Sequence, residues 1–156
     1  MKVFISCPFT GLCEDDNYEI KNEYKDFFNK LVEGIKLRGY DYYLAIKREN
    51  WGKDHKGPEE CTISDFNGVK DSDFLIVIPG NSISKGISGG VHVELGWASA
   101  LNKKLHILIE NNFIYSPVLM GLSVLTDTEY HECNDFLNDN MLKQIFKIID
   151  KEGESR

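Results

Sequence analysis

Apolar and polar positions along the chain follow two periods, and each change of period marks a predicted element. Short runs rich in β-branched and aromatic residues predict strands. Apolar positions that recur at steps of three and four residues predict helices. The predicted strands cover 2–6, 42–46, 74–78 and 105–109, and a short fifth strand is expected near Val124. The predicted helices cover 20–35, 59–69, 91–101 and 136–151.

This alternation of strand and helix predicts a parallel sheet with helices on both faces. The whole chain, 1–156, is expected to form a single doubly wound α/β domain, since 156 residues leave little room for a second one. Folds of this kind bind ligands beyond the carboxyl ends of the strands. Three predicted loops lie at that edge, at 6–11, 47–58 and 79–90.

Charge and cysteine usage narrow the classes of partner. The 18 Lys and Arg residues against 25 Asp and Glu give a net charge of −7, which argues against binding a nucleic-acid polymer. The negative charge does not argue against a small anionic ligand, because backbone dipoles can bind it locally. The four cysteines form no Cys-x-x-Cys pair and show no ligand spacing with the histidines, so we expect neither a metal site nor disulfides. His106, within a predicted strand, is expected in the core or at the end of the sheet.

Targeting signals are not apparent. The apolar start at 3–5 is too short for a signal-peptide core, and the longest strongly apolar run, 74–79, is too short to span a bilayer. We therefore expect a cytoplasmic, reduced protein with no membrane partner.

The segment 88–98 carries the strongest chemical signal. Gly89 and Gly90 precede a predicted helix, where glycine lets the backbone approach a ligand and free N–H groups favour negative charge. Glu94 lies in the first turn of that helix, on or beside the face that packs on the sheet. The helix dipole is expected to keep it ionised, which suits a nucleophilic carboxylate. The alternative is an ordinary glutamate near a helix start, which contributes about 0.3–1 kcal/mol.

Asp65 is the second candidate acid. It lies just before the turn that leads into the strand at 74–78. A second carboxyl group near the first serves as general acid for a leaving group, or orients a ligand hydroxyl. The alternative is a solvated or capping aspartate.

Two further loops offer groups for binding a substrate. In the first, Ser6 offers a hydroxyl for a sugar or phosphate, Pro8 shapes the turn and Phe9 offers a ring for stacking. The alternative is a turn closed by Pro8 and Gly11. In the second, Trp51 is placed either to cover a base or to anchor its loop to the domain.

The order and spacing of these motifs resemble the nucleoside 2-deoxyribosyltransferase family, including its branch of nucleoside 5′-monophosphate N-glycosidases. The matching segments are Lys-Val-Phe-Ile-Ser-Cys-Pro-Phe-Thr-Gly at 2–11, Asp-Phe-Asn-Gly-Val at 65–69, the strand at 73–78, Gly-Val-His-Val-Glu-Leu-Gly-Trp-Ala at 90–98 and the strand at 104–109. Beyond about residue 112 there is no clear match.

The resemblance implies a flavodoxin-like five-stranded parallel sheet, homo-oligomeric assembly and cleavage of the bond between a base and the sugar C1′, without a cofactor or metal. Carried over by position, Glu94 is the nucleophile that forms a glycosyl ester, and Asp65 lies on the leaving-group side. Ser88, six residues before Glu94, matches the serine with which the monophosphate hydrolases contact the 5′-phosphate. The first loop lacks the basic residue that some of these hydrolases place near phosphate, and we expect Lys85 to replace it.

Several alternatives stay open at this point. The substrate is a nucleoside or its 5′-monophosphate, and the glycosyl ester passes to water or to another base. A non-catalytic nucleotide-binding module and an NAD glycohydrolase-like enzyme are the competing functions. The apolar segment 113–121 is expected either to form the oligomer contact or to cover the core.

Overall fold

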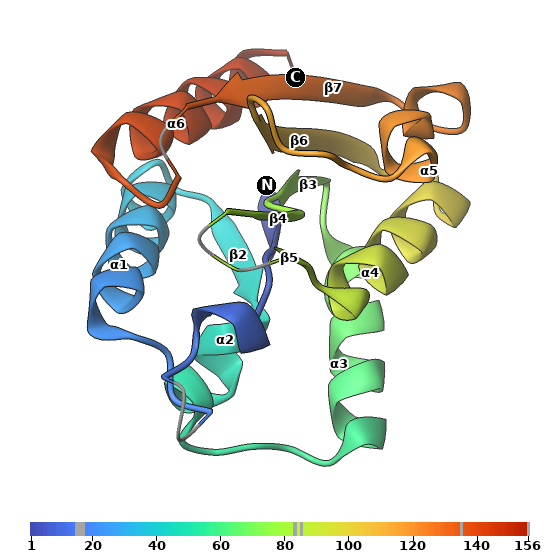
Figure 1. Cartoon of the computed structure of the whole chain (residues 1–156). Helices are drawn as coiled ribbons and strands as arrows, with labels where there is room; N and C mark the ends of the chain where they lie inside the picture. Colours follow the sequence, from blue (N-terminus) through green and yellow to red (C-terminus); the bar gives the residue numbers. More distant parts are fainter. Residues whose placement is uncertain (15–17, 83, 85, 135, 156) are drawn as a thin grey trace.

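A five-stranded parallel sheet forms the centre of the molecule (Figure 1). The computed structural model describes residues 1–14, 18–82, 84, 86–134 and 136–155. The strands follow the order β2-β1-β3-β6-β7, in which every hydrogen-bonded pair is parallel. Their bounds are β1 (Lys2–Ser6), β2 (Asp41–Leu44), β3 (Phe74–Val77), β6 (Lys104–Glu110) and β7 (Thr128–Cys133). This is the doubly wound order of flavodoxin-like sheets, so the predicted fold class is confirmed.

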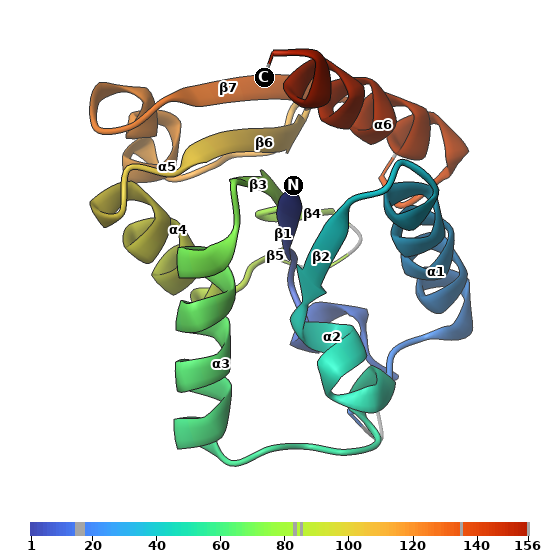
Figure 2. The same ribbon diagram turned by 180° about the vertical axis from the view of Figure 1, so that it is seen from behind.

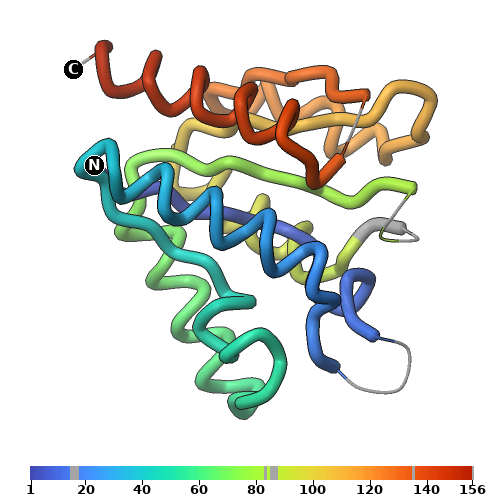
Figure 3. Tube along the Cα trace, turned by 90° about the vertical axis from the view of Figure 1, so that its left-hand side faces the viewer, coloured from blue at the N-terminus to red at the C-terminus, as the bar shows by residue number. Residues whose placement is uncertain are grey.

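Helices cover both faces of the sheet. Figures 1 and 2 show α1 (Asn22–Leu37) and α6 (Asp139–Glu154) on one face, and α3 (Pro58–Asp71) and α4 (Gly89–Ala100) on the other. Figure 3, seen from the side of α1 and α6, shows these two helices side by side in front of the sheet. Alternate strand residues supply the two apolar layers: Val3 and Ile5 pack toward α1 and α6, whereas Phe4 packs toward α3 and α4. Among the described residues, no helix combines the length and hydropathy that crossing a bilayer requires.

Short elements fill the connections. They are η1 (Thr10–Leu12), α2 (Ala45–Arg48), η2 (Asn50–Gly52), β4 (Gly80–Asn81), β5 (Gly86–Ile87), α5 (Pro117–Met120) and η3 (Leu122–Val124). The strand predicted at 42–46 therefore ends at Leu44, where α2 begins. The loop predicted at 79–90 contains the small antiparallel pair β4–β5.

The fifth strand is the one element that the sequence misplaced. Val124 lies in η3, and its side chain is 84% exposed. The strand is β7, four residues later, with the polar sequence Thr-Glu-Tyr-His-Glu-Cys. It lies at the edge of the sheet, where polar side chains are tolerated and the apolar signal of a strand is weak.

Candidate active site

A cavity of about 220 Å³ opens beyond the carboxyl ends of β1 and β2. Its wall combines residues from the loop after β1, from α2 and the segment that follows it, and from α3 and α4. The lining residues are Cys7, Phe9, Ala45, Ile46, Arg48, Glu49, His55, Lys56, Cys61, Asp65, Ser88, Gly90, Val91 and Glu94. This is the edge at which a doubly wound sheet binds its ligands, and both predicted acids lie in the wall.

Glu94 reaches the cavity from α4. It is the sixth residue of the helix, and only 9% of its surface is exposed. The hydroxyl of Ser6, at the end of β1, donates a hydrogen bond to its carboxyl group. Ser6 is itself buried. It contacts Glu94 from behind the cavity wall and is not among the residues that line the cavity.

The protonation of Glu94 differs from the prediction. Burial raises the pKa of Glu94 to about 8, and the charge of Asp65 adds to this, while the Ser6 hydrogen bond and the Arg48 charge oppose it. The prediction that Glu94 is an ionised acid in the first turn of its helix is therefore wrong for the protein without a ligand. Glu94 lies beyond the first turn, where the helix dipole acts most strongly, and the loss of water dominates.

Asp65, on α3, belongs to a hydrogen-bonded group. The Tyr43 hydroxyl donates to Asp65 Oδ1 over 2.7 Å, and Arg48 Nη1 donates to the same oxygen over 2.9 Å. Burial raises the pKa of Asp65, although both partners oppose the shift. Tyr43, in turn, has its pKa raised by burial and by Asp65. Asp65 is thus a carboxyl group held in a fixed orientation at the cavity wall.

Arg48 connects the two sides of this wall. Besides Asp65, it binds Glu49, with Nη2 lying 2.7 Å from Glu49 Oε1. Glu49 is 5% exposed, and its Oε2 accepts the backbone N–H of Lys56 over 2.7 Å. Burial opposes ionisation of Glu49, but the hydrogen bonds from Lys56 and Arg48 prevail and lower its pKa. The cavity therefore has a fixed guanidinium between two carboxyl groups.

The start of α4 gives the cavity its anion-binding character. Ser88 is the N-cap residue, and its hydroxyl makes no capping hydrogen bond. A Cβ at Gly89 would meet no atom within 4 Å, so the protein leaves the space beside it open. The first turn contains no acidic residue, and the N–H groups there lack partners within the helix. Ser88, Gly90 and Val91 line the cavity, where this helix start favours a negative group.

The loop that leads to Ser88 is tethered at its beginning. The Tyr115 hydroxyl donates to the Gly80 carbonyl over 3.0 Å and accepts the Glu110 N–H over 2.9 Å. The Ser82 hydroxyl also donates to Glu110 Oε1 over 2.6 Å. The end of β6 thus fixes the start of the connection between β3 and α4.

The remaining predicted residues divide into two groups. Phe9 lines the cavity, where its ring meets His55 edge to face at 5.8 Å. Within the described part of the chain, the cavity wall includes neither Pro8 nor Trp51. Trp51 packs against the apolar layer under α1, which agrees with the alternative that it anchors its loop. Lys85 lies outside the described residues.

Sequence reasoning missed the basic and polar residues that follow β2, namely Arg48, Glu49, His55 and Lys56. They stand in the loop predicted at 47–58, at the ligand edge, but they form no recognisable spacing. The signal that could have found them is a run of charged residues directly after a strand whose carboxyl end faces the ligand.

No protein-family model matches the chain, and no curated protein matches it in sequence. Solved structures do match. The CMP N-glycosidase BcmB of Clostridium botulinum superposes with a TM-score of 0.68 at 23% identity, over 97% of this chain and 99% of that one. BlsM gives a TM-score of 0.71 at 29% identity, over 97% and 93%.

A transferase shares the same architecture. The 2-deoxyribosyltransferase of Bacillus psychrosaccharolyticus gives a TM-score of 0.57 at 17% identity, over 91% of this chain and 96% of that one. The resemblance that the sequence motifs indicated is thereby confirmed in three dimensions: this chain has the fold of the nucleoside 2-deoxyribosyltransferase family.

Proposed function

We propose that the protein cleaves the N-glycosidic bond of a nucleoside or nucleoside 5′-monophosphate, with Glu94 as the nucleophile. The observation that carries the proposal is the buried Glu94 carboxyl group, held by Ser6 in the wall of a cavity that Asp65 also lines. The fold shared with a CMP N-glycosidase and a 2-deoxyribosyltransferase supports the same reaction class.

The proposed reaction has two steps. The ionised Glu94 oxygen bonds to C1′ while the bond from C1′ to the base nitrogen breaks, and the bonding electrons leave with the base. The base takes up a proton and departs. Water or a second base then attacks C1′ of the glycosyl ester, and Glu94 leaves as a carboxylate. Hydrolysis and transfer differ only in this second attacking group, and access of water to the closed site decides between them.

Asp65 is assigned to the leaving-group side. Its pKa is raised, and a carboxyl group with a raised pKa retains its proton to a higher pH than an exposed one. The hydrogen bonds from Tyr43 and Arg48 fix its orientation. Asp65 then donates a proton to the departing base, or a hydrogen bond that stabilises the charge developing on it.

A 5′-phosphate fits the start of α4. The Ser88 hydroxyl and the first N–H groups of the helix offer donors, and Lys56 adds a positive charge to the cavity. The cavity volume lies below the roughly 300–1,000 Å³ of typical ligand pockets, so it encloses only part of a nucleotide. We assign the sugar and phosphate to this enclosed part.

The test is a panel of nucleosides and 5′-monophosphates, with and without an acceptor base, read by chromatography. We expect Glu94→Ala to reduce base release by several orders of magnitude while calorimetry still detects ligand binding. Glu33→Ala, which changes an exposed glutamate of α1, is the matched control and keeps full activity. Undiminished base release in Glu94→Ala would refute the nucleophile.

The same panel separates the competing functions. Ligand binding without base release by the wild-type protein would instead indicate a non-catalytic module. Release of nicotinamide from NAD, with no activity on nucleosides or monophosphates, would indicate the glycohydrolase alternative.

Assembly of several copies is also part of the proposal. Ile114 and Val118 are 90% and 77% exposed, and Leu125 close by in the chain is 68% exposed. Exposed apolar side chains that gather in one segment commonly mark a protein contact. We expect light scattering to show a homo-oligomer that Val118→Asp dissociates, whereas a monomeric wild-type protein would contradict this assignment.

A further inference from the structure

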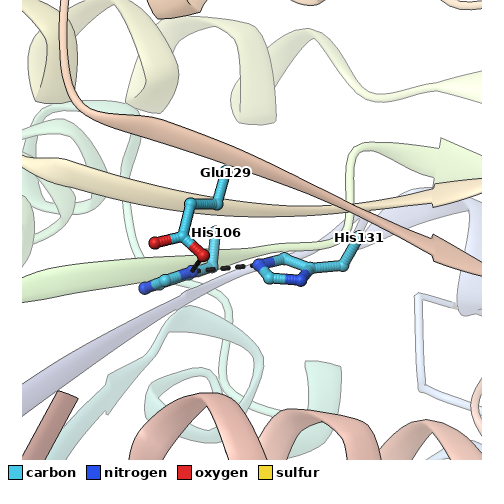
Figure 4. A group of neighbouring side chains, drawn as sticks. All are labelled: His106, Glu129 and His131. Atoms are coloured by element: carbon cyan, nitrogen blue, oxygen red, sulfur yellow. Dashed lines mark hydrogen bonds and ion pairs between the residues drawn. The ribbon is translucent and has the colours of Figure 1, made fainter. Parts of the chain in front are cut away.

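A second group of side chains with metal-ligand chemistry lies away from the cavity. His106 on β6 and Glu129 on β7 are directly paired in the sheet, and His131 follows Glu129 by two residues. Because side chains on a strand alternate between faces, Glu129 and His131 lie on one face of the sheet. Figure 4 shows the three side chains pointing toward one another.

The position of this group separates it from the active-site cavity. His106 lies near the amino end of β6, whereas the cavity lies beyond the carboxyl ends of the strands. The group also contacts α6, on the face of the sheet opposite α3 and α4. None of its three members lines the cavity.

The distances suit a common metal ion. One ligand atom from each side chain lies within 4.8 Å of the others. His106 Nδ1 lies 3.0 Å from His131 Nε2 and 4.0 Å from Glu129 Oε2. With bonds of about 2.0–2.2 Å to nitrogen and oxygen, ligand atoms of a tetrahedral zinc ion lie roughly 3.3 Å apart. Shifts of less than 1 Å bring these two separations to ligand distance, and the third separation lies within 4.8 Å. The ion would replace the hydrogen bond between His106 Nδ1 and His131 Nε2.

The second nitrogen of His106 has the partner that a metal ligand needs. His106 Nε2 lies 3.1 Å from Glu152 Oε1, on the last turns of α6. A metal-binding histidine commonly donates its other N–H to a carboxylate, which fixes the tautomer and directs the free lone pair toward the ion. This contact leaves Nδ1 as the lone-pair nitrogen, and Nδ1 is the atom that faces His131.

Two ammonium groups face the Glu129 carboxylate. Lys104 Nζ lies 3.2 Å from Glu129 Oε1, and Lys151 Nζ lies 3.1 Å from Oε2. Oε2 is the oxygen that faces His106, so Lys151 is the group that a cation would have to displace there. Its side chain is 61% exposed, and exposed ion pairs of this kind exchange at little cost.

We infer that His106, Glu129 and His131 bind a divalent transition-metal ion of the zinc class, with Glu152 as the positioning residue for His106. Three ligands with nitrogen and oxygen donors leave a fourth position for water. The ion ties the edge strand β7 to β6 and, through Glu152, to α6. No metal site was predicted from the sequence, because the histidines show no ligand spacing with cysteines and no paired carboxylate along the chain. The pairing of β6 with β7 brings the three side chains together.

The test is titration of the full-length, chelator-treated protein with Zn²⁺ in a calorimeter. We expect one equivalent to bind, and a saturating concentration near one hundred times Kd to raise the melting temperature by roughly 5–10 °C. His131→Ala and Glu129→Gln should each weaken binding about tenfold or more, and Glu152→Gln by about 10–100-fold. His92→Ala, which removes a histidine of α4 outside the group, should bind as the wild type does. Lys151→Met should bind more tightly, because it removes the competing ammonium group.

Cobalt provides a second readout that does not depend on stability. Co²⁺ bound to these ligands should give the visible absorption of a four- or five-coordinate ion, and His131→Ala should lose it. The inference is overturned if Zn²⁺ fails to bind at millimolar concentration, or if His131→Ala binds as tightly as the wild type. An intense thiolate absorption with Co²⁺ would overturn it as well, since the metal would then lie on cysteines.

Discussion

The hydroxyl of Ser6 donates a hydrogen bond to the carboxyl group of Glu94, although the two residues stand 88 positions apart in the chain. Ser6 ends β1 and Glu94 lies within α4, so the contact joins this strand to the helix that borders the cavity. This hydrogen bond fixes the orientation of the buried Glu94 carboxyl group. The chemistry of the site depends on how this acid exchanges its proton.

Activity should rise with pH. The pKa of Glu94 is raised to about 8, and only the ionised form attacks C1′. Below that pKa, kcat/KM should increase about tenfold per pH unit and then level off above it. Ser6→Ala removes a hydrogen bond that lowers this pKa, so its profile should shift to higher pH. Initial rates between about pH 5 and pH 9 measure both effects, and a flat wild-type profile would be incompatible with this assignment.

Stability should change with pH in the opposite direction. The folded-state pKa of Glu94 is raised from 4.5 to about 8, so between these values the folded protein holds a proton that the unfolded chain has released. The free energy of unfolding should therefore decrease as the pH rises through this window. Glu94→Gln keeps an acceptor for Ser6 and has no proton to lose. The free energy of unfolding of this variant minus that of the wild type should increase by on the order of 3 kcal/mol from pH 5 to pH 8, as measured by urea unfolding. An equal difference at both pH values would contradict the burial of Glu94.

Loss of Arg48 should destabilise the protein. Its guanidinium contacts Asp65 and Glu49, whose side chains are 20% and 6% exposed. Arg48→Met leaves both carboxyl groups without this partner, which we expect to cost about 2–4 kcal/mol. Lys30→Ala is the matched control: it breaks an ion pair with Asp139 whose side chains are 60% and 73% exposed, and it should cost less than about 1 kcal/mol. Denaturant unfolding of both variants makes the comparison, and similar losses would show that the Arg48 contacts contribute little.

Ser88 should distinguish nucleotides from nucleosides. Its hydroxyl stands at the start of α4 without a capping bond, available to a phosphate group. Ser88→Ala should weaken binding of a 5′-monophosphate by about 10–100-fold, the value of one hydrogen bond to a charged group, and leave binding of the matching nucleoside almost unchanged. Calorimetry with the two ligands measures the difference. Equal losses for both would remove Ser88 from the phosphate contact.

The fold could be predicted because its centre has strong apolar signals. The strand at 74–78 is apolar at every position, and the structure buries both faces of β3 as predicted. Gly39 ends α1 with a φ of +76°, a conformation that glycine adopts without strain. The signal failed at β7, because an edge strand exposes polar side chains and does not need an apolar pattern. His106 shows both outcomes, since its burial was predicted and its polar partners on β7 and α6 were not.

The site was predictable in position and less so in composition. The topology of a doubly wound sheet locates the ligand edge, and Glu94, Asp65, Ser88, Gly90 and Phe9 all line the cavity there. The protonation of Glu94 was not predictable, because it depends on burial and on a charge balance among residues distant in sequence. The contacts of Arg48 with Asp65 were hidden for the same reason. They arise only when the fold brings Arg48 of α2 and Asp65 of α3 to the same cavity.

The tether between Tyr115 and Gly80 extends the set of residues that govern the cavity. The described hydrogen bonds of Tyr115 involve Gly80 and Glu110 and no group assigned to chemistry, yet its hydroxyl fixes the beginning of the connection that ends at Ser88. Ligand preference in this architecture can therefore change through replacements remote from any ligand. Engineering that samples only the residues facing the substrate would leave this route unexplored.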